Sequence, residues 1–315
     1  MENKLYVTSS PHLRSEDSVE RIMLDVVIAL MPALIAGIII FGIRALFITV
    51  LCIVFSIATE AVIQILTHKD VTINDFSAVV TGILLAFNLP VSIPWWIAAI
   101  GSIFAIAIVK QVFGGLGHNF MNPALAARAF LLASWPVPMS RFTVDGITSA
   151  TPLAIIKGTE SSCELPSLFN MFIGLRGGTI GEVSIFALLI GAVYLLIRKV
   201  ITLRIPLSYI LTVAVLTWVL GKNGLFTGDP LYHIMAGGLI LGAFFMATDY
   251  TTSPVTPKGQ IIFGIGCGIF TSIIRLYGGY PEGVSYSILL MNIATPIIDK
   301  YTAPKVFGEV KINEQ

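Results

Sequence analysis

Long apolar segments are the feature that most constrains how this chain can fold. A helix that crosses a bilayer needs about 20 predominantly apolar residues, and fewer where it is broken or covered by neighbouring protein. Ten such stretches run over 22–40, 45–66, 76–88, 95–109, 122–135, 183–197, 207–220, 231–246, 260–276 and 284–298. Only 12% of the residues are charged, against about a quarter in a soluble domain, so the sequence predicts an all-α polytopic membrane protein.

Charge and cysteine content exclude several function classes. The formal net charge is +1 and no long run of lysine or arginine is present, so we expect no nucleic-acid partner. Three cysteines are too few for the four thiolates of an ordinary iron–sulfur cluster, so a metal cluster would have to belong to a partner. The first twenty residues are too polar for a cleaved signal peptide, and we expect the first span to be retained.

The distribution of lysine and arginine predicts the orientation. With the N-terminus inside, most basic residues of the connections, Lys110 among them, fall on the cytoplasmic side. We therefore expect both termini to be cytoplasmic and the long hydrophilic connection to face outside, in the cell (inner) membrane. The predicted parts are a cytoplasmic N-terminal segment (1–21), a first membrane repeat (22–135), an extracytoplasmic loop (136–182), a second membrane repeat (183–299) and a cytoplasmic tail (300–315).

The two halves share a pattern of proline, glycine and asparagine. In the first half Ala86-Phe87 precedes Pro90, and the features that follow are Gly114-Gly115 and Asn122-Pro123; the second half has Ala243-Phe244, Pro254, Gly278-Gly279, Asn292 and Pro296. An offset of five spans gives the halves opposite topology, so this pattern predicts two inverted five-helix repeats. Short segments such as 76–88 are typical of half-helices that line a site. The alternative is that proline and glycine kink tightly packed helices.

A polar heptapeptide in the outer loop carries the clearest chemistry. Residues 145–151 read D-x-x-[ST]-[GS]-A-T, which resembles the acceptor sequence on which flavin transferases esterify FMN through its phosphate to the last threonine. This pattern should arise by chance in roughly one chain in a thousand of this length. Thr151 is therefore the predicted attachment site, and Asp145, Thr148 and Ser149 are predicted recognition residues for the transferase.

Ordinary loop chemistry also explains part of the heptapeptide. Asp145-Gly146 is a turn dipeptide, and Thr151 before Pro152 is a good N-cap for a following helix. A helix start also suits phosphate oxygens, because unpaired N–H groups and the positive end of the dipole meet there. Arg141 and Lys157 are candidates to pair with the phosphate or with a reduced, anionic flavin ring; the alternative is that both are solvated loop cations.

Several segments together resemble the family of RnfD and of the B subunit of the sodium-pumping NADH:quinone reductase. They are 82–90, Asn122-Pro123-Ala124, the acceptor Thr148–Thr151, and Phe245–Asp249 followed by Ser253-Pro254. The resemblance covers nearly the whole chain and favours the RnfD branch, because the long extra N-terminal region of the quinone-reductase branch is missing. One departure is Ser149, where the commonest family pattern has glycine.

The resemblance implies a redox role. The family belongs to the six-subunit Rnf complex, which couples electron flow between reduced ferredoxin and NAD to movement of Na⁺ or H⁺. FMN on Thr151 would exchange electrons with the flavin-bearing RnfG, the other partners being RnfA, RnfB, RnfC and RnfE. It also implies a fold similar to urea transporters, and some members also hold a non-covalent riboflavin. The rival class is a passive channel or solute transporter of the same fold, and the acceptor sequence argues against it.

Ionisable groups inside apolar segments are costly and usually face the interior of a bundle. Asp25, Glu60 and Asp249 are candidates for an ion path. The alternatives are an ion pair of Asp25 with Arg21, hydration of Glu60 near the cytoplasm, and a turn capped by Asp249.

Three further polar groups lie near the presumed half-helices. We expect Arg128 to neutralise a carboxylate or to bind flavin phosphate. Asn88 and Asn122 are candidates to hydrogen-bond a flavin or to line a pore, and the alternative for both is a helix-terminus cap.

Overall fold

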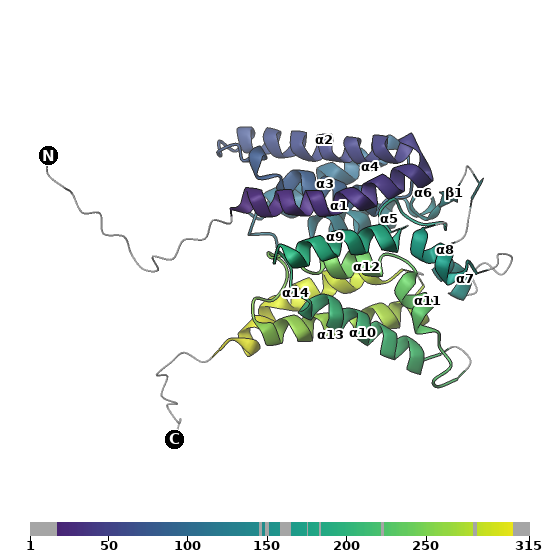
Figure 1. Cartoon of the computed structure of the whole chain (residues 1–315). Coiled ribbons are helices and arrows are strands. Elements are labelled where there is room, and N and C mark those ends of the chain that lie inside the picture. The colour runs from purple at the N-terminus through teal and green to yellow at the C-terminus, as the bar shows by residue number, and fades with distance from the viewer. Residues whose placement is uncertain are drawn as a thin grey trace, which may run out of the picture.

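The computed structural model describes residues 18–144, 147–148, 151–157, 165–174, 176–182, 184–221, 224–279 and 282–304. In these residues the chain is helical apart from two short antiparallel strands, β1 (Thr143–Val144) and β2 (Ile147–Thr148). Figure 1 shows two groups of helices lying against each other, one from each half of the chain.

The helices divide by sequence into these two groups and a set of short elements between them. The first group consists of α1 (Val19–Phe41), α2 (Ile43–Leu66), η1 (Ile73–Asp75), α3 (Ser77–Phe87), α4 (Trp95–Phe104), the π-helix η2 (Ala105–Gln111) and α5 (Pro123–Ser134). The second consists of α9 (Ile185–Ile197), α10 (Arg204–Val219), α11 (Pro230–Met235), α12 (Leu239–Leu241), the π-helix η3 (Gly242–Met246), α13 (Pro257–Tyr277) and α14 (Val284–Thr302). The connecting elements are α6 (Pro136–Ser140), β1, β2, α7 (Pro152–Lys157) and α8 (Leu168–Ile173).

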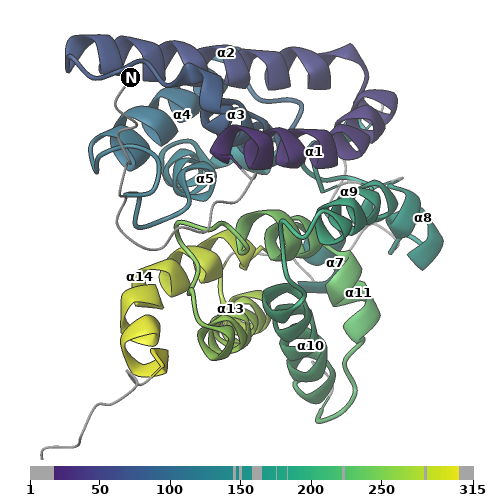
Figure 2. The same cartoon turned by 60° about the vertical axis from the view of Figure 1, so that its left-hand side comes forward.

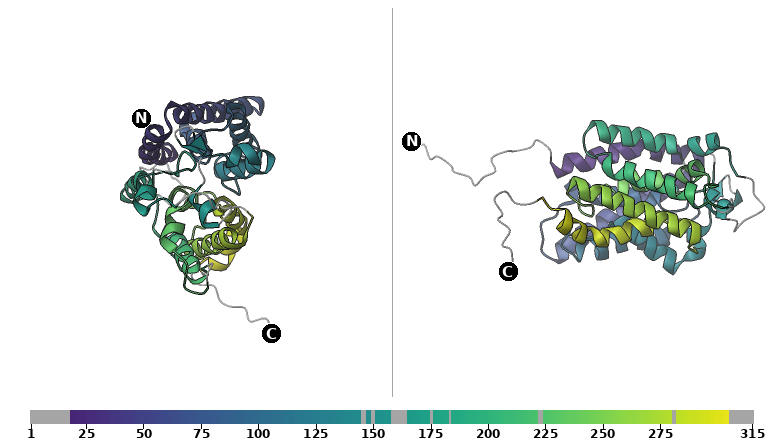
Figure 3. Two further views of the ribbon diagram at one scale, coloured as in Figure 1. Left: turned by 90° about the vertical axis from the view of Figure 1, so that its right-hand side faces the viewer. Right: turned by 90° about the horizontal axis from the view of Figure 1, so that it is seen from below.

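Figure 2 separates the two groups more clearly, with α9 lying beside α1 at the junction. In Figure 3, α1 begins and α14 ends at the end of the bundle opposite to the short connecting helices. We call the end that carries α7 and α8 the loop end.

Three helices, α1, α2 and α13, are long and apolar enough to cross a membrane, and five shorter apolar helical stretches accompany them in the described residues. Large apolar side chains such as Ile39, Phe47 and Ile297 are exposed on the outside of the bundle. A bilayer would cover these side chains, so the predicted membrane class agrees with the arrangement of the helices.

The predicted segments correspond to helices within a few residues, with one exception. The segment predicted over 231–246 is not continuous, because α11 ends at Met235 and the helix resumes only at Leu239. Gly237 between them has φ +67°, a left-handed conformation that glycine adopts without strain. The prediction of one unbroken span here is therefore wrong.

The hydrophilic stretch between the two groups returns into the bundle before α9. The backbone N–H groups of Ile180 and Gly181 donate to the carbonyls of Leu89 (3.1 Å) and Phe87 (3.0 Å). These carbonyls lie at and just beyond the end of α3, where no further turn of helix can accept from them. Residues 176–182 thus cap a broken helix of the first group, and we call them the return segment.

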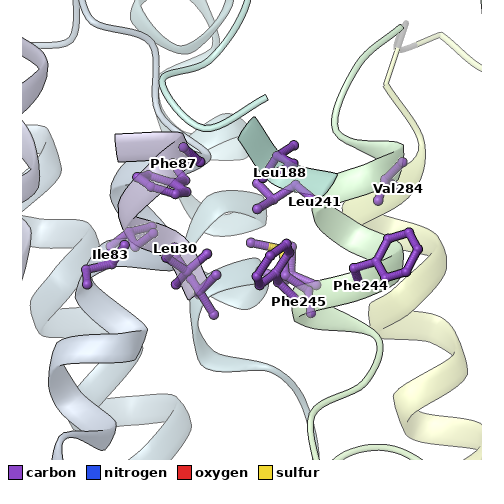
Figure 4. Packing of buried hydrophobic residues seen from close by; sticks show 14 of the residues in the cluster. Leu30, Ile83, Phe87, Leu188, Leu241, Phe244, Phe245 and Val284 are labelled. Atoms are coloured by element: carbon purple, nitrogen blue, oxygen red, sulfur yellow. The ribbon is translucent and has the colours of Figure 1, made fainter. Parts of the chain in front are cut away.

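Buried side chains from both halves fill the junction. In Figure 4, Leu30, Ile83 and Phe87 of the first group lie across from Leu188, Leu241 and Phe245 of the second. Helices in lipid gain stability from close packing more than from leaving water, so small residues matter where two helices cross. Gly191 of α9 is such a residue, because it lies against the backbone of α1 at Ala29.

Replacing Gly191 by alanine is expected to lower stability by about 1–3 kcal/mol, since the added Cβ would lie 1.9 Å from the carbonyl oxygen of Ala29 and α1 and α9 would have to separate. The matched control is Gly266→Ala, whose Cβ would meet the flexible end of the Met291 side chain. The measurement is the apparent thermal midpoint of the purified protein in detergent. Equal midpoints for the two variants would contradict the close approach.

Candidate functional site

Thr151 lies at the start of α7. Its hydroxyl oxygen accepts a hydrogen bond from the N–H of Ala154 (3.3 Å), and its carbonyl accepts from Ala154 and Ile155. The side chain is buried, with 5% of its surface exposed. Thr148 belongs to β2, whereas Asp145 and Ser149 lie outside the described residues. The hydroxyl named by the acceptor sequence is therefore also the one that begins α7.

Helix α7 packs against the second group of helices. Leu153 contacts Met171 of α8 and Ala236 after α11, and the Lys157 ammonium donates to the carbonyl of Gly278 at the end of α13. A cavity of about 350 Å³ lies beside α7 and is also lined by residues of α10, α11 and α13. Arg141 is exposed, and its carbonyl accepts from the hydroxyl of Ser92 before α4. We call the space beside α7 the loop-end cavity.

A buried ion pair joins the two halves. Arg128 of α5 pairs with Glu282, which lies just before α14. The same guanidinium donates to the side-chain oxygens of Asn88 (3.1 Å) and Ser285 (2.9 Å). The Asn88 amide in turn donates to the Leu84 carbonyl in the last turn of α3 (2.7 Å). Arg128 thus neutralises a carboxylate and holds the broken end of α3.

Two other buried arginines hold the break after α11. Arg275 of α13 donates to the carbonyls of His233 and Ala236, and Arg176 of the return segment donates to those of Met235 and Glu182. These carbonyls lack helical partners because the helix stops there. Sequence reasoning counted both arginines only as charges on the outer side. The neighbouring Gly237-Gly238 break was the available signal that such carbonyls would need donors.

Glu182 is the one carboxylate of this region without an ion pair among the described residues. It lies in the return segment, is 3% exposed, and accepts a hydrogen bond from the N–H of Thr179 (3.0 Å) on one oxygen. The other oxygen has no hydrogen-bond donor within the described part of the chain. Burial, followed by the negative charge of Glu282, raises the pKa of Glu182 to about 7, although Arg128 and Arg176 act in the opposite direction.

The raised pKa predicts a pH-dependent stability. The folded chain holds more protons on Glu182 than the unfolded chain between about pH 4.5 and pH 7, so stability falls as pH rises through this window. Glu182→Gln stays neutral and should be more stable than the wild type at alkaline pH by up to about 3 kcal/mol, with no gain at acidic pH. Apparent thermal midpoints across pH measure the effect, with the exposed Asp229→Asn as control. Parallel curves for the wild type and Glu182→Gln would contradict it.

A second buried ion pair lies in the first group. The Lys110 ammonium contacts both carboxylate oxygens of Glu60 (2.8 and 2.9 Å) and the hydroxyl of Ser77 (2.6 Å), and the Gln111 amide donates to the same carboxylate (2.8 Å). Glu60 is 1% and Lys110 2% exposed. The expectation that Glu60 is hydrated near the cytoplasm is therefore wrong, and Lys110 is a buried partner of a carboxylate, not a free cytoplasmic charge.

Two sequence candidates border a smaller cavity of about 100 Å³ between α1, α3, α9 and η3. Asp249 accepts from the N–H and hydroxyl of Thr251 and from the hydroxyl of Thr252, as expected for a capped turn. The Asn122 side chain accepts from the N–H groups of Ala124 and Leu125 and so caps α5.

Asp25 of α1 is buried at the junction of the two halves. It pairs with Arg198 (3.1 Å) and accepts a hydrogen bond from the hydroxyl of Tyr194 (2.8 Å), both of α9. Sequence reasoning had considered Arg21, four residues earlier in the same helix, as its partner. Within the described ranges no group of three or more His, Cys, Asp or Glu side chains is placed to hold a metal ion.

Apolar helices around broken helix ends and buried ion pairs define a multi-helix integral membrane protein. The chain belongs to the NQR2, RnfD, RnfE family, whose model matches residues 6–308, and the family prediction is confirmed.

Three relatives, all D subunits of ion-translocating complexes, show how far the similarity extends. The chain is 56% identical to that of the Na⁺-translocating ferredoxin:NAD⁺ oxidoreductase complex of Acetobacterium woodii, over all of this chain and 98% of the relative. It is 49% identical to that of the proton-translocating ferredoxin:NAD⁺ oxidoreductase complex of Clostridium ljungdahlii, over 97% of each chain. It is 36% identical to that of the ion-translocating oxidoreductase complex of Salmonella newport, over 97% of this chain and 99% of that one.

Proposed function

We propose that this chain is the D subunit of an ion-translocating ferredoxin:NAD⁺ oxidoreductase complex and is inactive alone. Similarity over the full length of two such subunits supports this assignment. One of the two relatives is named for Na⁺ and the other for protons, so similarity leaves the transported cation open. Ion uptake by the assembled complex, measured with and without Na⁺, decides between them.

The chain is proposed to carry FMN covalently on Thr151, and the observation that carries this proposal is the acceptor sequence ending there. The residues present fit the group: the hydroxyl lies at a helix start, and an ester oxygen keeps a lone pair for the N–H of Ala154. Bound FMN supplies one-electron transfer, while Thr151 fixes its position. Because the hydroxyl is buried, the transferase must act before this segment packs, or while it is displaced.

The neighbouring residues have proposed supporting roles. Asp145, Thr148 and Ser149 are recognised by the transferase, and Arg141 and Lys157 are the nearby cations proposed to pair with the phosphate. The partners are RnfA, RnfB, RnfC, RnfE and RnfG, with the flavin-bearing RnfG meeting the loop end. Non-covalent riboflavin stays part of the proposal without assigned residues. Asp25, Glu60 and Asp249 stay candidates for an ion path, since each lies buried or beside a cavity in the bundle.

The proposed architecture is two inverted five-helix repeats in the inner membrane, similar to urea transporters, with cytoplasmic termini and the loop end outside. Two observations support it. Each group contains a π-helix, η2 or η3, next to a helix break, and α1 begins and α14 ends at the end opposite to α7 and α8 (Figure 3).

A denaturing gel tests the redox assignment against the rival, a passive channel or solute transporter. The chain is purified from cells that contain the flavin transferase, denatured and examined for fluorescence that stays with the protein band. A fluorescent band is expected, since a phosphoester survives denaturation. A colourless band would overturn the redox assignment, because a channel of the same fold needs no flavin.

A further inference from the structure

We propose that the Glu182 carboxyl is an internal proton-binding site of this membrane protein, loaded and unloaded from the loop end. The site is separate from the flavin anchor at Thr151, and the inference goes beyond the proposed function because it assigns a ligand, the proton, to a residue outside the acceptor sequence.

The geometry around Glu182 leaves one oxygen in need of a proton. Oε1 has the N–H of Thr179, but Oε2 lies against Gly238, where even an added Cβ would be 3.1 Å away, and has no donor in the described residues. A buried carboxylate with an unsatisfied oxygen carries a large desolvation penalty. Protonation removes the charge and so removes most of this penalty.

Charged groups reach Glu182 from every element packed around it. They are Arg128 of α5, Arg176 of the return segment, Arg275 of α13 and Glu282 before α14, and His233 of α11 lies next to Arg275. The three guanidinium groups already bind Glu282 or the carbonyls of the α11 break, so none of them pairs with Glu182.

This set of charges selects the ligand. Three guanidinium groups repel a metal cation, and hard cations take six or more oxygen ligands, whereas the unpartnered side-chain oxygens here are Glu182 Oε2 and Glu282 Oε1. An anion would meet two carboxylates. A proton needs one oxygen, and binding it forms one O–H bond and changes the local charge by one unit.

The loop-end cavity gives the site a route to water. His233 and Arg275 line this cavity, and the Nδ1 of His233 is buried without a partner in the described residues. Arg275 also binds the carbonyl of Ala236, two residues before Gly238, against which Glu182 lies. One layer of side chains therefore separates Glu182 from the cavity.

Proton binding at Glu182 acts on the junction of the two halves. The return segment holds the end of α3 through Ile180 and Gly181 and the break after α11 through Arg176. A unit change of charge between these two broken helices alters the electrostatic balance of the Arg128–Glu282 pair, which joins the same elements.

Infrared difference spectroscopy of the complex, titrated from acidic to alkaline pH in nanodiscs, tests the proposal. The wild type is expected to lose one protonated-carboxyl band with a midpoint near pH 7. The band should be absent in Glu182→Gln and present in the control Asp229→Asn, an exposed carboxylate that lines the loop-end cavity. Isotopic labelling of glutamate carboxyls in the wild type should shift the band, and this readout does not depend on a variant folding.

Three outcomes would overturn the proposal: no titrating band, a band that labelling of glutamate does not shift, or a band that Glu182→Gln retains. Each is independent of the proposed redox function. Covalent flavin on the same samples is read by fluorescence of the denatured chain, so its loss and the loss of the carboxyl band identify different failures.

Discussion

Thr151→Val is expected to abolish covalent flavin, with no fluorescence left in the denatured band, while the protein still inserts into the membrane. The substitution removes the hydroxyl that forms the phosphoester and leaves the apolar spans unchanged. It also removes the acceptor for the N–H of Ala154, which should cost about 1 kcal/mol as the loss of a helix cap. Membrane fractionation and in-gel fluorescence measure the two effects on one sample.

Thr151→Asn separates attachment from capping. Asparagine is a good N-cap but has no hydroxyl to esterify, so this variant should fold as stably as the wild type and still lack flavin. Thr227→Val, at an exposed threonine in the connection between α10 and α11, is the matched control and should keep its flavin. Covalent flavin retained in Thr151→Asn would contradict the assignment and leave Thr151 with a capping role only.

Lys110→Met is expected to lower the free energy of unfolding by about 3–5 kcal/mol. The change leaves the Glu60 carboxylate buried without a cation, and breaking one side of a buried pair costs far more than the pair contributes. The hydroxyl of Ser77 also loses its contact with the ammonium. The apparent thermal midpoint in detergent reports the loss, with the exposed Lys69→Met as the control for removal of a lysine.

The double variant Lys110→Met with Glu60→Leu tests the cause of this loss. Replacing both members of a buried pair by apolar groups is often nearly neutral, so the second substitution should restore most of the stability that the first removes. Additive losses from the two single variants would show that packing around each residue, and not the unpaired charge, is responsible. Ion uptake by the same variants reports independently on the candidate role of Glu60 in an ion path.

The sequence predicted the features that depend on local composition. A run of apolar residues identifies a membrane helix wherever it occurs, and the helices lie within a few residues of those runs except at 236–238. The asparagine cap of α5 and the threonine at the start of α7 were also readable, since a cap depends on residues three or four positions apart. The family followed from motifs distributed along the whole chain, and the match over 6–308 confirmed it.

Pairings between distant residues were not readable. Glu60 with Lys110, Asp25 with Arg198, and Arg128 with Glu282 each join residues at least fifty positions apart, and several acceptable partners existed for each charge. Glu182 passed unnoticed because a carboxylate at the end of a hydrophilic stretch is usually hydrated. Only the return of that stretch against α3 makes it buried and unpaired.

The sequence by itself determined that the chain lies in a membrane, which helices it forms, the family to which it belongs, and the threonine that matches a flavin acceptor. These properties follow from apolarity and short motifs, which act over a few turns of chain. The tertiary structure alone decided where α11 breaks, which arginines take up the freed carbonyls, and which carboxylates find a cation. Burial fixes those choices, because away from water each polar group must be satisfied by whichever partner the fold brings near it.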